Sequence, residues 1–171
     1  MGAARQPVIV QEYDPSWPGQ FEQLRARVLD ALGDLAVGVE HVGSTAVPGL
    51  PAKPVIDLDV VVASAEDVPA AVERLAGLGY QHEGDLGIPG REAFRWPSGS
   101  ERHHLYLCPR DSPELARHLR FRDHLRAHPE VAAAYARLKL DAAAAHRDDR
   151  DAYSAAKSGF VEQVLRAASA S

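Results

Sequence analysis

The stretch that decides the fold spans residues 41–59 and reads HVGSTAVPGLPAKPVIDLD. It opens with a turn at Gly43 and Ser44 and closes in an apolar run that carries Asp57 and Asp59. Side chains two residues apart in a strand share a face, so the two carboxylates point the same way. The stretch therefore predicts a strand with an acidic face, preceded by a glycine turn.

Two neighbouring carboxylates in a half-buried strand repel each other and lose solvation, which calls for a compensating cation. Mg²⁺ prefers oxygen ligands and often binds through one or two carboxylates together with substrate phosphates. The preceding turn offers N–H groups and a hydroxyl to such phosphates. Paired acids also occur in salt bridges and at strand ends. However, Leu58, Val60 and Val62 oppose Asp57 and Asp59, which places the acids inside the strand.

Length and charge narrow the class of protein. The chain has 171 residues, which suits one compact domain or a domain with a helical extension. Its net charge of −5 argues against a dedicated nucleic-acid binder, so we do not expect a nucleic-acid partner. The last part of the chain is mildly basic, with 11 Lys and Arg against 9 Asp and Glu in residues 110–171.

Cysteine content and apolar segments give the expected compartment. Cys108 is the single cysteine, so no disulfide can form within the chain, and it reads as a small core residue. The N-terminal sequence lacks the apolar core of a signal peptide, and no stretch approaches the length of a membrane span. We therefore expect a cytoplasmic protein without a membrane partner.

Hydrophobic periodicity and turn residues predict an α+β fold. The expected strands are 8–13, 36–42, 55–62, about 79–83, about 91–96 and 102–108. The expected helices run from the turn at 14–18 to Leu32, over about 67–77, and then over about 113–127, 130–146 and 149–168. This order predicts a small mixed β-sheet with helices in residues 1–110 and a helical subdomain packed on it in residues 111–171.

These residues resemble the GrpB family, a group within the polymerase β-like nucleotidyltransferase superfamily. The superfamily pattern is a Gly-Ser or Gly-Gly turn followed by a D-x-D strand, and Gly43, Ser44, Asp57 and Asp59 match it. The likeness covers about residues 8–165. Besides residues 41–57, it is carried by HHLYL at 103–107, FRDHLR at 121–126, and the pairs Tyr135 with Lys139 and Tyr153 with Lys157.

The resemblance implies transfer of a nucleotidyl group from ATP or another nucleoside triphosphate to a small-molecule or protein acceptor. Asp57 and Asp59 would hold Mg²⁺ ions that clamp the attacking and leaving oxygens. Gly43 and Ser44 would position the triphosphate. Relatives of this domain are also fused to dephospho-CoA kinase. The alternative is therefore a binding module that holds a nucleotide or a CoA-type ligand without turnover, and the oligomeric state stays open.

Active members of the superfamily commonly carry a third acid on a later strand, and the matching run 102–108 has none. With its two leucines facing the core, His104 faces the aspartates. We predict that His104 is a metal ligand or the general base, although it could be a surface histidine. An imidazole ligand would make Mn²⁺ or Zn²⁺ an alternative to Mg²⁺, and metal-assisted hydrolysis is a third hypothesis. Glu92 and Glu101 are further candidates for the missing acid.

Three basic residues are candidates for phosphate binding. Lys53 could reach a phosphate oxygen from its loop, although a loop lysine is commonly plain surface. Arg122 and Arg126 lie one helical turn apart on one face, and guanidinium groups suit phosphate. Their alternative is a helix surface with weak Asp–Arg pairs. Four further residues are interpreted as mostly structural, with the lysines as outside candidates: Tyr135, Lys139, Tyr153 and Lys157.

Overall fold

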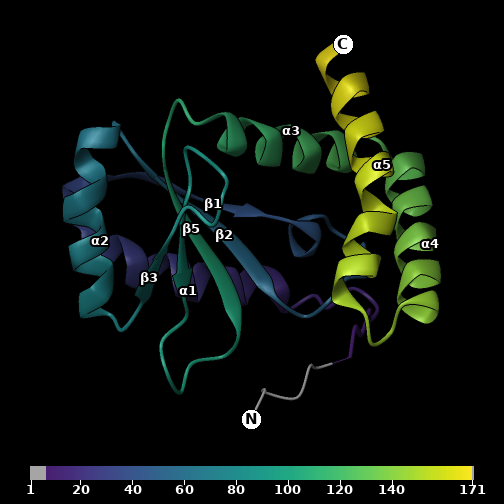
Figure 1. The fold of residues 1–171 in the computed structure, drawn as a ribbon, viewed down its shortest axis with the longest axis horizontal. Coiled ribbons are helices and arrows are strands. Elements are labelled where there is room, and N and C mark those ends of the chain that lie inside the picture. Colours follow the sequence, from purple (N-terminus) through teal and green to yellow (C-terminus); the bar gives the residue numbers. More distant parts are fainter. Residues whose placement is uncertain (1–6, 171) are drawn as a thin grey trace.

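The structure is a computed structural model that describes residues 7–170 (Figure 1). The helices are α1 (Trp17–Leu32), α2 (Val68–Gly77), α3 (Pro113–Ala127), α4 (Pro129–Ala145) and α5 (Arg150–Ala170). The strands are β1 (Ala36–Val42), β2 (Ile56–Val62), β3 (Gln81–Gly84), β4 (Glu92–Arg95) and β5 (His103–Pro109). Short 3-10 turns lie at η1 (Gly33–Leu35), η2 (Ser44–Ala46) and η3 (Ala65–Asp67). The predicted α+β class is confirmed.

The five strands form one mixed sheet in the order β1-β2-β5-β4-β3. β2 and β5 run parallel, and the other neighbours are antiparallel. The register of the parallel pair sets Asp57 beside His104 and Asp59 beside Tyr106. The two strands with the predicted chemistry are therefore adjacent at the centre of the sheet.

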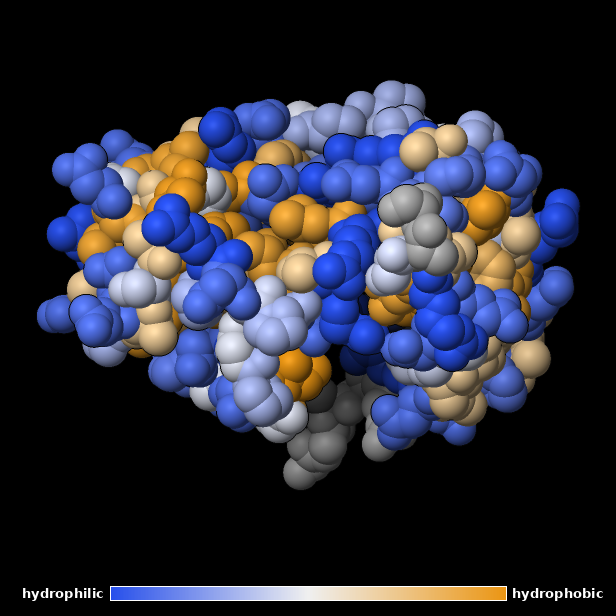
Figure 2. All heavy atoms as spheres, turned by 90° about the horizontal axis from the view of Figure 1, so that it is seen from above, coloured by the Kyte–Doolittle hydropathy of each residue, from blue (hydrophilic) through white to orange (hydrophobic). Residues whose placement is uncertain are grey.

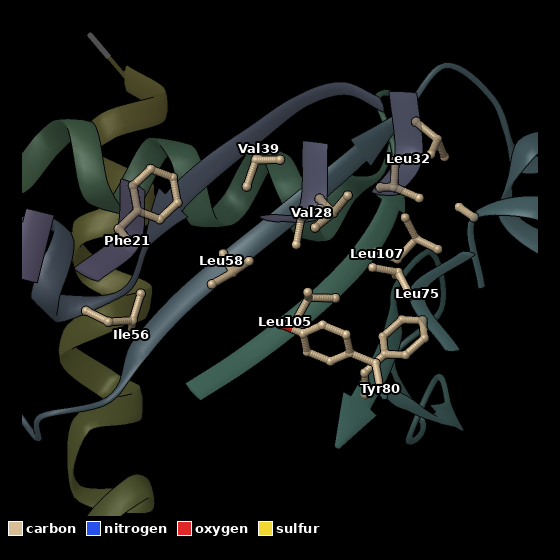
Figure 3. Packing of buried hydrophobic residues seen from close by; sticks show 14 of the residues in the cluster. Phe21, Val28, Leu32, Val39, Ile56, Leu58, Leu75, Tyr80, Leu105 and Leu107 are labelled. Carbon is tan, nitrogen blue, oxygen red and sulfur yellow. The ribbon is translucent and has the colours of Figure 1, made fainter. Parts of the chain in front are cut away.

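Alternate residues of β2 and β5 point to opposite faces of the sheet. Leu58 of β2 and Leu105 and Leu107 of β5 are fully buried in the cluster that packs against α1 and α2. Figure 3 shows these leucines with Val28 of α1 in the layer between helix and strands. The predicted apolar face is confirmed. Asp57 points to the other face, which α3, α4 and α5 cover.

The last three helices pack on the rest of the chain through small apolar clusters. Leu115 of α3 packs on Val61 and Cys108, so the predicted core position of the cysteine is confirmed. Leu125 of α3 packs with Val47 of the loop that follows η2. The predicted units 1–110 and 111–171 extend at their outer ends beyond the described residues, and their boundary stays a prediction.

The predicted strand at 8–13 is wrong. This segment makes one isolated bridge, between Gln11 and Ala52, and no further ladder. Val8 and Val10 instead pack against the C-terminal helices, where Val8 contacts Tyr153, whereas Ile9 is exposed and Tyr13 packs on the main core. An extended segment that packs one side on helices has the same alternation of apolar and polar residues as a strand in a sheet.

Prolines and a serine cap explain where the helices begin. Proline occupies one of the first two positions of α1, α2, α3 and α4, where its missing N–H costs no helical hydrogen bond. At the start of α3, the Ser112 hydroxyl accepts a hydrogen bond from the Leu115 N–H, 3.4 Å away. The predicted helix starts therefore agree with the structure to within one residue for α3 to α5.

The helices of the described chain are too short or too polar to cross a membrane. The face shown in Figure 2 is mixed, with hydrophobic side chains interspersed among hydrophilic ones.

Candidate functional site

The Gly43–Ser44 turn is built against the Asp57 carboxylate. Gly43 follows β1 with φ 75°, a left-handed conformation that favours glycine. A Cβ atom at this position would overlap the carboxylate of Asp57, on the neighbouring strand. Glycine is therefore required twice here, for the backbone conformation and for the close approach, so the turn and the acid form one unit.

Asp57 and His104 form a hydrogen-bonded pair on adjacent strands. The Nδ1 atom of His104 donates to Oδ1 of Asp57 over 2.7 Å. Both side chains are partly exposed, 37% for His104 and 28% for Asp57. The expectation that His104 faces the aspartates is confirmed. The hydrogen bond orients the imidazole and leaves its Nε2 atom free for chemistry.

Asp59 has a different environment, because its side chain is only 1% exposed. Nδ1 of His118, on α3, donates to Asp59 Oδ2 over 2.6 Å, and Nε2 of His118 lies 3.2 Å from Glu114 Oε1. Burial raises the pKa of Asp59, against the effect of this hydrogen bond. Burial disfavours the charged imidazole of His118, but its hydrogen bond to Asp59 and the charges of Asp59, Glu114 and Asp57 raise its pKa overall. His118 therefore holds Oδ2 of Asp59 from the side of α3.

The metal ion predicted at Asp57 and Asp59 fits these residues only if a bound substrate supplies some of its ligands. Within residues 7–170, no three His, Cys, Asp or Glu side chains converge in a way that could hold an ion. Asp59 Oδ1 is nevertheless buried without a hydrogen-bond partner among these residues. Two carboxylates suit a Mg²⁺ ion whose other ligands are substrate phosphates and water. Nδ1 of His104 is occupied by Asp57, so ligation of a metal by His104 stays a prediction.

A cavity of about 300 Å³ opens on this face of the sheet. Five predicted site residues line it: Gly43, Ser44, Lys53, Asp57 and His104. Asp59 is not among the lining residues. It lies behind His118, which does line the cavity. Two outside candidates of the sequence analysis, Lys139 and Lys157, also line it. Further lining residues that were not predicted as site residues include Arg91, Arg102, Tyr106, Tyr135 and Tyr153. The cavity therefore joins the sheet, the turn and the last two helices in one site.

The wall of the cavity carries an excess of positive charge. It contains three lysines and two arginines, and Asp57 is the one carboxylate among the lining residues. Lys139 is only 1% exposed, and burial together with Lys157 and Lys53 lowers its pKa to about 7. Burial and Lys53 lower the pKa of Lys157 to about 8. Such an arrangement is unfavourable unless an anion binds there.

Lys53 does not sit in an exposed loop, as its alternative interpretation assumed. It is partly buried, and its Nζ atom lies 5.1 Å from the centre of the Tyr153 ring. The sequence did contain a signal for the lysines beyond it. The spacing Tyr-x-x-x-Lys occurs in both α4 and α5, and it puts an aromatic ring and an ammonium group on the same helix face. No comparable signal marked His118.

Arg122 and Arg126 share a helix face, as predicted, but they lie outside the cavity lining. Nη1 of Arg122 donates to Glu40 Oε2 over 2.7 Å and to the His41 carbonyl over 3.1 Å, and its Nε donates to Asp123. Nε of Arg126 donates to the Ala46 carbonyl over 2.9 Å. The two arginines thus hold the backbone on both sides of the glycine turn. The structure thus shows a positioning role, and the predicted contact of these arginines with phosphate stays a prediction.

Several sequenced proteins are similar to this chain over most of its length. UPF0157 protein YqkA of Bacillus subtilis is 35% identical over 150 residues, covering 88% of this chain and 44% of the relative. A UPF0157 protein of Pseudomonas aeruginosa is 39% identical, covering 89% and 64%. This chain therefore spans less than two thirds of these two relatives. A dephospho-CoA kinase of Mycolicibacterium paratuberculosis is 30% identical, covering 96% of this chain and 47% of the kinase.

Solved structures support the same fold. The crystal structure of the conserved protein GrpB from Enterococcus faecalis superposes with a TM-score of 0.85 at 37% identity, covering 94% of this chain and 96% of that one. A structure of Cid1 poly(U) polymerase superposes with a TM-score of 0.57 at 12% identity, covering 86% and 49%, which shows a shared fold alone.

The profile of the GrpB protein family matches residues 7–167. This range contains the turn, both aspartates, His104, His118 and all three lysines of the cavity. With the match to the Enterococcus faecalis structure, it settles the family: the chain belongs to the GrpB family and has a nucleotidyltransferase-like fold.

Proposed function

We propose that this GrpB-family protein binds ATP or another nucleoside triphosphate in the cationic cavity and transfers its nucleotidyl group to an acceptor hydroxyl. The observation that carries the proposal is the convergence of three features on one cavity. These are the glycine turn packed on Asp57, the Asp57–His104 pair, and the wall of lysines and arginines. The fold shared with the Cid1 poly(U) polymerase is consistent with the same reaction class.

The phosphates would lie along the basic wall. A triphosphate supplies the negative charge that the wall lacks, and its phosphate chain would lie among the lysines that line the cavity. Gly43 leaves room for close approach of an oxygen to the backbone, and the Ser44 hydroxyl can donate a hydrogen bond. The same cations would stabilise the pyrophosphate as it leaves.

Asp57 and Asp59 would hold a Mg²⁺ ion together with the phosphates of the bound nucleotide. The ion would neutralise charge on the phosphate oxygens. Asp59 would take part through Oδ1, which has no hydrogen-bond partner among the described residues, while His118 holds Oδ2. The ion is expected to bind together with the nucleotide, whose phosphates would supply further ligands, and Mn²⁺ could replace Mg²⁺.

The protein's own acid–base group would be His104. An acceptor oxygen forms the new bond to the α-phosphorus, and the bond to the pyrophosphate oxygen breaks. The acceptor proton passes to Nε2 of His104, because Nδ1 is held by Asp57. Asp57 keeps the imidazole in the tautomer that can accept this proton.

A second candidate is binding without turnover. One observation favours it, since Asp57 is the one carboxylate among the lining residues and the strand β5 supplies histidine where active superfamily members carry an acid. The similarity to a dephospho-CoA kinase suggests a nucleotide or a CoA-type molecule as the ligand. In this case the cavity holds the ligand's phosphates and the acceptor is absent.

The test follows α-labelled ATP with Mg²⁺ and a panel of hydroxyl acceptors. We expect label on an acceptor and release of pyrophosphate, reduced at least about a hundredfold by Asp57→Asn. Asp141→Asn, on the exposed surface of α4, is the matched control and should leave the rate unchanged. Binding of ATP without consumption would favour the second candidate, and label released only as nucleotide products would indicate hydrolysis. Equal turnover by Asp57→Asn would sink the proposed site.

A further inference from the structure

All three lysines of this chain line one cavity. The sequence has 16 arginines but only three lysines, Lys53, Lys139 and Lys157. Everywhere else, the chain uses arginine for positive charge. The two side chains differ in one property that matters here: a guanidinium stays charged, whereas a buried ammonium readily loses its proton. The cavity therefore gathers the basic groups whose charge can change.

The lysines reach the cavity from three separate segments. Lys53 comes from the loop before β2, Lys139 from α4 and Lys157 from α5. Their Nζ atoms lie over tyrosine rings: Lys157 at 4.4 Å and Lys53 at 5.1 Å from the centre of Tyr153, and Lys139 at 5.0 Å from Tyr135. Ring faces attract a cation weakly. None of the three makes an ion pair with a carboxylate among residues 7–170.

Burial and neighbouring positive charges lower the pKa of all three lysines. Burial is the largest cause in each case. Lys157 and Lys53 further lower the pKa of Lys139, and Lys53 further lowers the pKa of Lys157. Arg150 and Arg102 act on Lys53 in the same direction, whereas Asp57 opposes the shift at all three. The remaining titratable and charged groups of the wall are Arg91, His104, Tyr106, His118, Tyr135 and Tyr153.

We infer that the cavity is a proton-coupled polyphosphate site, in which a chain of two or three phosphates binds among the three lysines and the lysines take up protons as it binds. The inference deepens the proposed function, because it concerns the phosphate end of the same ligand site. A polyanion favours the charged form of each ammonium it touches, so binding and protonation support each other. The phosphate chain alone then carries most of the recognition, and the nucleobase contributes little.

The direct test is calorimetric titration with inorganic tripolyphosphate, without metal, at about pH 8, where the unliganded Lys139 is largely neutral. Two buffers with different protonation enthalpies give the number of protons exchanged. We expect uptake of about one proton per tripolyphosphate, and for each proton taken up, about tenfold weaker binding per unit of pH above 8. Adenosine, which has no phosphate, should not bind measurably. Failure of tripolyphosphate to bind, or binding without proton uptake, would overturn the inference.

Two variants and a control separate charge from proton exchange. Lys139→Met should weaken tripolyphosphate binding about tenfold or more. Lys139→Arg should keep the binding and lose about one proton of uptake, because guanidinium is charged throughout this pH range. Arg137→Met changes an exposed residue of the same helix and should alter neither quantity. Thermal unfolding of each variant identifies any that does not fold, and the wild-type titration stands without them. Wild-type affinity in a folded Lys139→Met variant would also contradict the inference.

The outcomes distinguish this inference from the proposed transfer reaction. Tripolyphosphate binding with proton uptake, but no consumption of ATP with any acceptor, would support the polyphosphate site and count against transfer. Turnover of labelled ATP, with tripolyphosphate binding that exchanges no proton, would support transfer and remove the proton coupling.

Discussion

The two faces of the central sheet are built from the same strands and have opposite chemistry. On one face, Leu58 and Leu107 are fully buried under α1 and α2. On the other, Asp57 and His104 form a hydrogen-bonded pair under α3 to α5, beside a cavity lined by basic residues. A shift of one residue along β2 or β5 would exchange the faces. The rigid apolar layer therefore fixes the register that positions the polar pair.

The comparison also separates stability from function. The apolar face contributes free energy of folding through burial, whereas the polar face carries groups whose burial is unfavourable without a ligand. Lys139 is the clearest case, since it is 1% exposed with no carboxylate partner among the described residues. We therefore expect changes on the first face to reduce stability and changes on the second to reduce ligand binding.

The largest effect on stability is expected from Leu107→Ala. The side chain is fully buried between the sheet and the helices, and its truncation should lower the free energy of unfolding by about 3 kcal/mol. Urea unfolding measures this, with Leu140→Ala as control, because Leu140 is 46% exposed and its truncation should change stability by less than about 0.5 kcal/mol. An equal loss of unfolding free energy in the two variants would contradict the stabilising role of the apolar face.

A pH-dependent effect is expected from Lys139→Met. The pKa of Lys139 is about 7 in the folded protein and 10.5 in its ordinary state, so the unfolded chain binds more protons between these values. This lysine therefore destabilises the fold most near and below pH 7, and the penalty fades as pH rises towards 10.5. The variant's gain in unfolding free energy over wild type should shrink by about 2 kcal/mol from pH 7 to pH 9. Parallel pH profiles for the two proteins would contradict this account, and Arg137→Met should follow wild type.

A smaller effect is expected at the glycine turn. Gly43→Ala introduces a Cβ atom that meets the Asp57 carboxylate, whereas Gly99→Ala meets open space. Both glycines have positive φ, 75° and 83°, so either alanine variant carries backbone strain. Gly43 also has ψ −174°, a combination that is essentially restricted to glycine, so the contact with Asp57 and this strain act together in Gly43→Ala. We expect an excess loss of stability of about 1 kcal/mol over Gly99→Ala. No excess would show that the turn is not packed on the acid.

The smallest effect is expected from Arg126→Met. Its side chain donates to the Ala46 carbonyl beside the turn, and loss of this hydrogen bond should lower the unfolding free energy by about 0.5 kcal/mol, because Arg126 is exposed. Arg120→Met, on the exposed part of α3, is the control and should change little. Tripolyphosphate affinity should fall less than twofold in Arg126→Met, because Arg126 lies outside the cavity lining. A loss of tripolyphosphate affinity as large as that of Lys139→Met would indicate that Arg126 contacts phosphate directly.

Much of the sheet could be predicted from alternation within the sequence. The period of two in residues 55–62 gave the apolar and acidic faces of β2, and the same rule placed His104 towards Asp57. The strand predicted at 8–13 was wrong because an extended segment packed on helices shows the same alternation as a strand. The contact of Val8 with Tyr153 is an example.

The sequence predicted the turn, the D-x-D strand and His104 as site residues, but it did not predict which residues of the last three helices meet them. The turn and the D-x-D strand share one short stretch, whereas His118 and the two helical lysines reach the cavity through the packing of α3, α4 and α5 on the sheet. Helical spacing placed Arg122 and Arg126 on one face, but could not show that this face meets the backbone at His41 and Ala46.

The most direct test of the central claim is a crystal structure of the protein with Mn²⁺ and a non-hydrolysable nucleoside triphosphate. The account predicts phosphates among the three lysines and an anomalous manganese peak between these phosphates and the Asp57 carboxylate. A triphosphate bound elsewhere on the molecule, with the basic cavity empty at saturating ligand, would contradict it.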